Sequence, residues 1–411
     1  MAAKKSNRRQ FLSGEAAINA IGDVRVGSDK LDNPTRANSR SILLEFARKA
    51  MACQFQIYIN SGQYRTGPDA SIHGLDLVDL LEDQLTVYRN HSEISQINEN
   101  AAETDITVEP FLFDLLLRAI GIHQITGGAF DITSGPLTRL WGFHRREGNF
   151  PPQNEIDETL ELIGSHQIEL NSEQRTIRFH RSGLEINLGA IGKGYALDRC
   201  ASLMDYDEQV EHFLIHGGHS SVLGRGDKGW RPKSKKQQSP PEKNDSAETS
   251  RETQIDLEQI DLEQVDQAQN APIVKDELSN REGWSVALRH PLRTDQRLAE
   301  IWLFDEALGT SGAANQFFYH RGKRYGHILD PRTGWPAEGT LSATVITKNA
   351  ETADALATGC YVMGLEQVQQ FHQEHPEHGI IMVTPGKRAG QNELHTFGMD
   401  DRKWQVLMDK I

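Results

Sequence analysis

The sequence predicts an α+β fold with a mixed sheet, and three observations predict it. Several short segments alternate apolar and polar residues with the two-residue period of a strand. Other segments repeat apolar residues every three or four positions, as amphipathic helices do. The two kinds of segment interleave without a strict strand–helix–strand rhythm, which favours an α+β fold over a doubly wound one.

The first half of the chain supplies strands and helices in turn. The ordered fold is expected to begin with the alternating strand 55–59, followed by two amphipathic helices over 72–85 and 112–120. Residues 184–188 alternate as a further strand that runs into the Gly-rich turn 189–194. A helix should start at this turn.

The second half continues the same pattern. Residues 352–373 have the apolar spacing of a long helix. Strand-like segments lie at 212–215, 284–288, 299–304, 317–319, 341–347 and 380–383. The domain that these elements build therefore spans 41–230 and 283–411.

The segment 231–282 between these two stretches differs in composition. A basic stretch precedes an acidic one, in which Ile-Asp-Leu-Glu-Gln is repeated immediately. A five-residue period matches neither a helix nor a strand, so we expect a low-complexity, charged, largely disordered insertion. A segment that docks a partner is the alternative interpretation.

The composition excludes several classes of protein. The 411 residues carry a formal charge of -14, which is the wrong sign for binding nucleic acid. No apolar run is long enough to predict a transmembrane helix. The three cysteines are widely spaced and lack zinc-site spacing, so they are expected to be buried thiols.

Residues 1–40 are expected to be a disordered N-terminus. The pair Arg8-Arg9 resembles a twin-arginine export signal, but Glu15, Asn19 and Asp23 stand where such a signal needs an apolar stretch. The sequence thus favours a cytoplasmic protein, with export to the periplasm by a degenerate twin-arginine signal as the alternative.

Two oxygen-bearing side chains fall on one face of the long helix. Asp354 and Thr358 are four residues apart, so their carboxylate and hydroxyl point the same way, one turn from each other. Hard oxygen ligands of this kind suit Mg²⁺. The spacing alone favours a simpler alternative, an Asp near a helix N-terminus and a Thr bonded to a carbonyl.

Two further motifs could contact a phosphate. In the turn 189–194, which follows a strand and opens a helix, backbone N–H groups and Lys193 could receive and neutralise phosphate, although a plain tight turn explains the residues equally well. His327 precedes the turn at Pro331, where it could act as a general base or donate a hydrogen bond to a phosphate oxygen. A structural hairpin with a solvated histidine is the alternative.

Taken together and in order, these motifs resemble the ApbE-like FAD:protein FMN transferase family. The resemblance covers roughly residues 46–386 outside the insertion. It rests on Tyr88 with Ser92–Asn98, Gly128–Thr133 with Gly135–Leu137 and Leu140–Phe143, Leu188–Tyr195, Thr310–Gly312, His327–Gly334 and Ala353–Thr358.

The resemblance implies a T-shaped α+β flavin transferase fold and a Mg²⁺-dependent reaction. Such an enzyme moves FMN from FAD onto a Ser or Thr of an acceptor protein, with a motif like Asp-x-x-(Ser/Thr)-Gly-Ala-Thr, and releases AMP. By resemblance, the Mg²⁺ ligands are Ala190, through its carbonyl, Asp354 and Thr358. The residues that would line the FAD site are Met51, Tyr88, Ala129, Phe130, Asp131, Lys193 and His327.

One departure and two alternative functions accompany this interpretation. Residues 51–53 read Met-Ala-Cys where the family commonly has Met-Gly-Thr, which affects the expected flavin contact of Met51. An FAD pyrophosphatase that releases FMN and AMP would need the same metal site. A non-catalytic flavin-binding protein is the other alternative, and intact Asp354, Thr358 and Lys193 argue against it.

Overall fold

The computed structural model describes residues 42–228 and 282–408, apart from Arg146, His219, Thr294, Asn315 and Ala389. The expected disordered N-terminus and nearly all of the expected insertion lie outside the described residues.

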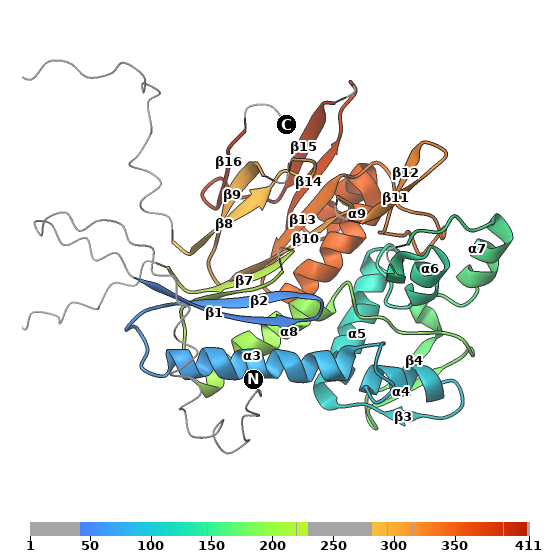
Figure 1. Cartoon of the computed structure of the whole chain (residues 1–411), viewed down its shortest axis with the longest axis horizontal. Helices are drawn as coiled ribbons and strands as arrows, with labels where there is room; N and C mark the ends of the chain where they lie inside the picture. Colours follow the sequence, from blue (N-terminus) through green and yellow to red (C-terminus); the bar gives the residue numbers. More distant parts are fainter. Residues whose placement is uncertain are drawn as a thin grey trace, which may run out of the picture. The chain divides into compact units, whose positions relative to one another are not determined.

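An eight-stranded sheet forms the centre of the described fold (Figure 1). In spatial order its strands are β1 (Leu43–Ala50), β2 (Cys53–Asn60), β6 (Phe213–Gly217), β7 (Ser221–Arg225), β10 (Glu306–Gly312), β13 (Ser342–Thr347), β14 (Gly379–Pro385) and β15 (Asn392–Phe397). The expected α+β class is confirmed. Every neighbouring pair in this sheet is antiparallel, which differs from the mixed sheet that we expected. Adjacent strands here are joined by hairpins or return connections, and antiparallel pairing needs no crossover unit.

The fold begins one strand earlier than the sequence predicts. β1 pairs with β2 from Leu43 opposite Asn60 to Ala50 opposite Cys53, and a two-residue turn joins them. Residues of β1 such as Glu45 and Lys49 weaken the apolar alternation by which a strand is recognised. Pairing with the strongly alternating β2 makes this segment a strand.

The helices follow the expected spacing where the apolar period is strong. The two predicted amphipathic helices are α3 (Gly67–Leu85) and α5 (Pro110–Ile125). The long predicted helix is α9 (Ala350–Glu374), but it is kinked at Gly364, whose φ of 72° is not helical. The remaining helices are α4 (Glu93–Asn100), α6 (Gly135–Leu140), α7 (Gln153–Leu160), α8 (Gly192–Ser202), the 3₁₀ turns η2 (Phe143–Arg145) and η3 (Ser165–Gln167), and the π-turn η4 (Leu203–Asp207).

The two faces of the central sheet are covered by different layers. Ala343 and Val345 of β13 belong to the large core shared with the helices, whereas Ile346 belongs to a second core. That second core lies against the three-stranded sheet of β8 (Trp284–Arg289), β9 (Arg297–Leu303) and β16 (Trp404–Val406). Alternation along one strand thus buries both faces of the sheet.

Smaller strand groups complete the described fold. β3 (Ile106–Thr107), β4 (Ile168–Asn171) and β5 (Thr176–Phe179) form a three-stranded sheet, and β11 (Phe317–His320) pairs with β12 (Lys323–Gly326) as a hairpin. An aromatic core around Trp141, Phe150 and Tyr325 packs against this hairpin.

The expected strand 184–188 is wrong, because these residues join no strand ladder. They are extended and alternate between buried and partly exposed positions, as the pattern predicted. The Asn98 side chain replaces a neighbouring strand: it donates to the Ile186 carbonyl (2.9 Å) and accepts from the Ile186 amide (2.8 Å). A side-chain amide of this kind satisfies the backbone without a ladder.

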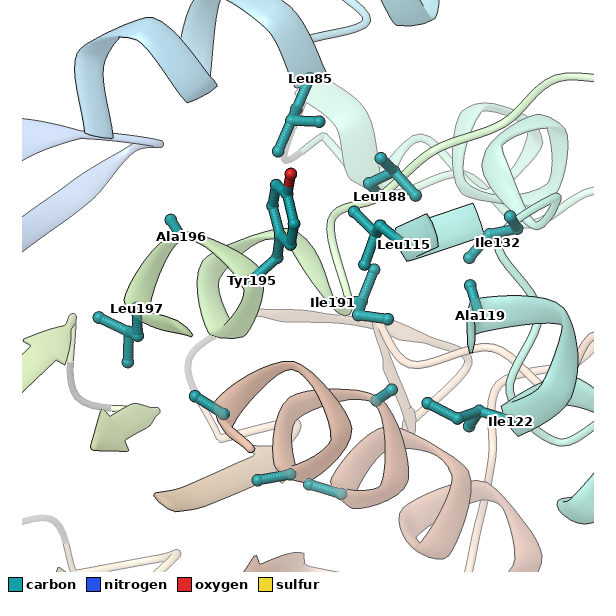
Figure 2. Close-up of a cluster of buried hydrophobic side chains, with 14 of the residues drawn as sticks. Leu85, Leu115, Ala119, Ile122, Ile132, Leu188, Ile191, Tyr195, Ala196 and Leu197 are labelled. Carbon is teal, nitrogen blue, oxygen red and sulfur yellow. The ribbon is translucent and has the colours of Figure 1, made fainter. Parts of the chain in front are cut away.

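The helix expected after the Gly-rich turn is α8, and its first turn lies over a well-packed core. Figure 2 shows Leu85 of α3, Leu115 of α5 and Ile191 gathered near Tyr195 of α8. Tyr195 and Ile191 are fully buried. This packing fixes where the turn and the start of α8 lie.

Within the described residues, no helix is both long and apolar enough to cross a membrane.

Candidate active site

The Asp354 carboxylate, in the second turn of α9, collects three donors from two other elements, β7 and α8. It is 4% exposed. Oδ1 accepts a hydrogen bond from the Ser221 hydroxyl of β7 (2.8 Å). Oδ2 accepts from the Gly194 amide (3.1 Å) and from Lys193 Nζ (3.3 Å), both in the first turn of α8. The start of α8 therefore points one N–H group and a cation at a buried carboxylate of α9.

Thr358 lies one turn further along α9 and faces the end of β10. Its hydroxyl is 2.9 Å from the Ser311 hydroxyl and 3.4 Å from the Asp354 carbonyl. β10 approaches this closely because residue 309 is glycine: a Cβ there would lie 2.3 Å from the Ala353 carbonyl oxygen. The expectation that Asp354 and Thr358 share one helix face is confirmed.

The turn of the β1–β2 hairpin lies near the same carboxylate. Burial raises the pKa of the Cys53 thiol, and the nearby charges of Lys193 and Asp354 act on it in opposite directions. Met51, half-buried, and Ala52 occupy the turn with positive φ angles of 48° and 58°. Cys53, Lys193 and Asp354 therefore come from three elements to one place.

The segment with Ala129, Phe130 and Asp131 packs beside α9. Ala129 and Phe130 are fully buried. A Cβ at Gly359, the residue after Thr358, would lie only 2.9 Å from Thr126 Cγ2, so the absence of a side chain there permits the close approach of the residues just before this segment. Phe130 Cβ lies at an ordinary contact distance of 3.5 Å from the same position.

Asp131 itself is surrounded by donors from the protein. Oδ1 accepts from the amide (2.8 Å) and hydroxyl (2.7 Å) of Thr133 and from the Ser165 hydroxyl (2.7 Å). Oδ2 accepts from the Ser165 amide (3.1 Å) and lies 3.1 Å from His123 Nδ1. Burial alone would raise the pKa of Asp131, but the hydrogen bonds from His123 and Thr133 lower it below its ordinary value.

His327 directly follows β12. Its Nδ1 lies 3.2 Å from the Gln316 carbonyl, and its ring meets Phe143 edge-on. Because a carbonyl can only accept, Nδ1 carries the proton in the neutral ring and Nε2 keeps the lone pair. Burial lowers the pKa of His327, which keeps the ring neutral near pH 7.

Tyr88 lies at the surface, just beyond α3, and is 76% exposed. Its backbone amide donates to the Thr86 hydroxyl. Ala190 precedes α8 in the turn and is half-buried. Described contacts join Lys193 to Asp354 and Thr358 to Ser311, whereas the contacts described for Tyr88, Asp131 and His327 lead to other residues.

The donor chemistry at Asp354 and Thr358 fits a hard divalent cation. A buried carboxylate, hydroxyls of Thr358 and Ser311, and the backbone of the turn before α8 are all oxygen ligands of the type that Mg²⁺ prefers. In the described part of the chain, no three His, Cys, Asp or Glu side chains gather in a cluster that could hold a metal. A site of one carboxylate with hydroxyl and carbonyl oxygens would not form such a cluster.

Two residues of this site lacked a role in the sequence reasoning. Ser311 belongs to the motif Thr310–Gly312, but nothing in the spacing of this motif shows that Ser311 faces Thr358. Ser221 carries no sequence signal, because it reaches Asp354 only when β7 pairs with β10. The partners of a buried carboxylate on a helix come partly from the neighbouring sheet. Hydroxyl residues of the strands next to α9 are therefore the ones to consider.

Known proteins resemble this chain along most of its length. The model of the ApbE family matches residues 51–259 and 271–382. The chain is 26% identical over 340 residues to a protein of Treponema pallidum named FAD:protein FMN transferase, covering 79% of this chain and 81% of that protein. It is 27% identical over 298 residues to the Escherichia coli K12 protein of the same name, covering 70% of each chain.

Solved structures share the fold. The crystal structure of the ApbE protein from Thermotoga maritima superposes with a TM-score of 0.64 at 25% identity, covering 84% of this chain and 94% of that one. The flavin transferase ApbE from Vibrio cholerae gives a TM-score of 0.65 at 22% identity, covering 87% of this chain and 97% of that one.

Proposed function

The chain belongs to the ApbE family, and from this premise we propose that it is an FAD:protein FMN transferase. The observation that carries the proposal is the contact between the first turn of α8 and Asp354 of α9. There Lys193 and the Gly194 amide face a buried carboxylate one turn from the Thr358 hydroxyl. The Treponema pallidum and Escherichia coli proteins named FAD:protein FMN transferase match 79% and 70% of the chain.

The reaction that we propose is an in-line displacement at phosphorus. The hydroxyl of a Ser or Thr on an acceptor protein attacks the phosphorus of the FMN half of FAD. A new P–O bond forms, the bond to the AMP phosphate breaks, and AMP leaves with the electron pair. The acceptor hydroxyl loses its proton in the same step.

Asp354, Thr358 and the Ala190 carbonyl would hold Mg²⁺, as their oxygen chemistry fits. When bound, the cation neutralises pyrophosphate charge as a Lewis acid. Lys193, which lies 3.3 Å from Asp354 Oδ2, offsets further negative charge on the pyrophosphate. The first amides of α8 add the partial positive charge of a helix N-terminus.

His327 is the proposed general base. The neutral ring with its proton on Nδ1 presents the Nε2 lone pair to the acceptor hydroxyl, and receives its proton there. The remaining proposed FAD contacts are Met51, Tyr88, Ala129, Phe130, Asp131 and Lys193. Ala129 and Asp131 would contribute through their backbone, because the Asp131 oxygens are engaged by Thr133 and Ser165.

Product analysis of the full-length protein tests this function. The protein is incubated with FAD, with and without Mg²⁺, and with and without a peptide that carries Asp-x-x-(Ser/Thr)-Gly-Ala-Thr. We expect Mg²⁺-dependent AMP release together with a peptide mass increase equal to one FMN less water. Free FMN with AMP and an unmodified peptide would instead identify an FAD pyrophosphatase. The same peptide with Ala at the Ser/Thr position is the control.

A further inference from the structure

α9 begins at a residue whose own side chain does not cap it. The N-cap residue Asn349 makes no side-chain hydrogen bond to the first turn. The cap comes from another helix: Asp198 of α8 accepts from the Ala350 amide through Oδ1 (2.9 Å) and from the Glu351 amide through Oδ2 (2.8 Å). A carboxylate that receives two N–H groups at a helix N-terminus is a strong cap.

The same two helices meet a second time, one turn further on. Gly194 lies four residues before Asp198 on α8, and Asp354 lies four residues after Ala350 on α9, so the contact of Gly194 with Asp354 repeats the cap contact at the next turn. The helices touch at backbone distance, since a Cβ at Gly194 would lie 2.1 Å from the Ala350 carbonyl oxygen. Two contacts one turn apart fix both the rotation of α9 about its axis and its position along that axis relative to α8.

We infer that Asp198 is a positioning residue, which sets Asp354 and Thr358 against Lys193 through its cap on α9. This inference rests on the proposed function, because it concerns the residues that would hold Mg²⁺. Asp198 touches neither Asp354 nor Thr358 in the described contacts. It acts on them through the first turn of the helix that carries both.

The surroundings of Asp198 make the cap sensitive to protonation. Burial raises its pKa to about 7, the two amides of α9 oppose this rise, and Glu351 adds to it. Arg225 of β7 faces it with positive charge. Asp198 borders a cavity of about 550 Å³, whose other charged residues are Arg118, Arg199, Asp207 and Glu351. Arg118 pairs with Glu351 in the lining of this cavity.

The test compares Asp198→Ala and Asp198→Asn in the full-length protein, with Asp207→Asn as the matched control. Asp207 lines the same cavity but caps no helix in the described contacts. Mg²⁺ binding is measured by calorimetry without FAD, and amide hydrogen exchange is measured over residues 350–358. Steady-state kinetics with FAD then separate KM from kcat.

We expect Asp198→Ala to weaken Mg²⁺ binding by up to about tenfold, which is the stability of a helix N-cap transmitted in full to the metal site, and to speed exchange in the first turn of α9. Asp198→Asn keeps one acceptor oxygen and should fall between Asp198→Ala and the wild type. Mg²⁺ affinity of the wild type should fall as pH drops from 8 to 6, and this slope should flatten in Asp198→Asn. KM for FAD should change less than Mg²⁺ affinity.

Two results overturn the inference alone: normal Mg²⁺ binding by Asp198→Ala, or an equal loss in Asp207→Asn. Wild-type protein that binds no Mg²⁺ would overturn the proposed metal site together with this inference. Wild-type protein that binds Mg²⁺ but does not modify the acceptor would contradict the transferase function and leave the positioning role supported by calorimetry and exchange.

Discussion

Two buried aspartates, Asp131 and Asp354, stand in motifs of equal prominence in the sequence, yet the structure surrounds them differently. Asp131 accepts hydrogen bonds from the amides and hydroxyls of Thr133 and Ser165 and pairs with His123. Asp354 accepts from one hydroxyl, one amide and a lysine. Donors from Thr133, Ser165 and His123 saturate the first carboxylate, whereas the second shares its charge with the cationic side chain of Lys193.

This difference favours a structural role for Asp131 and supports the metal-binding role that we propose for Asp354. Breaking the Asp131 network leaves several buried donors without a partner, which destabilises the fold. Changing Asp354 removes the negative charge that Lys193 and a divalent cation would share. Motif membership alone does not reveal this, because Ser165 reaches Asp131, and Ser221 and Lys193 reach Asp354, from distant segments.

The largest expected effect is that of Asp354→Asn on activity. The amide keeps the size of the side chain but loses the charge that binds Mg²⁺, so FMN transfer should fall about a thousandfold, which corresponds to roughly 4 kcal/mol of transition-state stabilisation. The rate of AMP release at saturating FAD measures it. The free energy of unfolding should fall less than in Asp131→Asn, because the amide oxygen can still accept from Gly194 and the amide NH₂ can donate to the Ser221 hydroxyl. Near-normal Mg²⁺-dependent activity would remove Asp354 from the metal site.

Asp131→Asn should show the opposite pattern. The amide NH₂ would face the hydroxyl and amide donors of Thr133 and Ser165, so the free energy of unfolding should fall by roughly 3 kcal/mol. Urea denaturation measures it, and the activity of the protein that stays folded should be reduced far less than in Asp354→Asn. If Asp131→Asn keeps its stability but loses FAD binding, Asp131 is a substrate ligand and the contrast between the two aspartates fails.

His327→Asn tests a residue that contacts neither aspartate in the described structure. General-base assistance contributes about 10²–10⁴-fold, so transfer at saturating FAD should slow at least about a hundredfold at neutral pH. Because burial lowers the pKa of His327, the wild type should lose activity only as pH falls below the ordinary histidine range. The defect of the variant should shrink at high pH, where the acceptor hydroxyl ionises more readily.

A variant that binds FAD weakly but turns over normally at saturation would give His327 a ground-state role. Lys193→Met provides the matched comparison, since loss of a pyrophosphate contact should weaken FAD affinity more than turnover. The two variants together separate binding from proton transfer.

The pair of His123 and Asp131 adds a dependence on pH. The hydrogen bond to Asp131 is the main cause that raises the pKa of His123, and burial opposes it. Protonated His123 therefore stabilises the fold below its unfolded pKa of about 6.5, and this contribution is lost as pH rises through the folded value. The unfolding free energy of the wild type should fall between pH 6 and pH 8.5 more than that of His123→Gln. Equal slopes would contradict the ion pair.

The sequence predicted those features of the candidate site that depend on spacing within one segment. It missed the residues that reach the site from distant segments. Asp354 and Thr358 could be placed on one face because helix spacing determines this, and the start of α8 followed from its glycines. Ser221 and Asp198 could not be found, because they reach α9 only after β7 joins the sheet and α8 packs on α9. The strand expected at 184–188 failed for a related reason: its alternation is real, but the Asn98 amide replaces the ladder.

The smallest expected effect concerns Ala52, in the hairpin turn beside Cys53. Ala52 has a φ of 58°, a conformation that a Cβ disfavours and glycine adopts freely. Ala52→Gly should therefore raise the free energy of unfolding by about 0.5–1 kcal/mol, after the greater freedom of glycine in the unfolded chain is set against the relieved strain. Ala50→Gly is the control: Ala50 is a buried residue of extended β1, so the same chemical change should destabilise there. Urea denaturation of both variants measures the difference, and a loss of stability in Ala52→Gly would show that the turn holds Ala52 without strain.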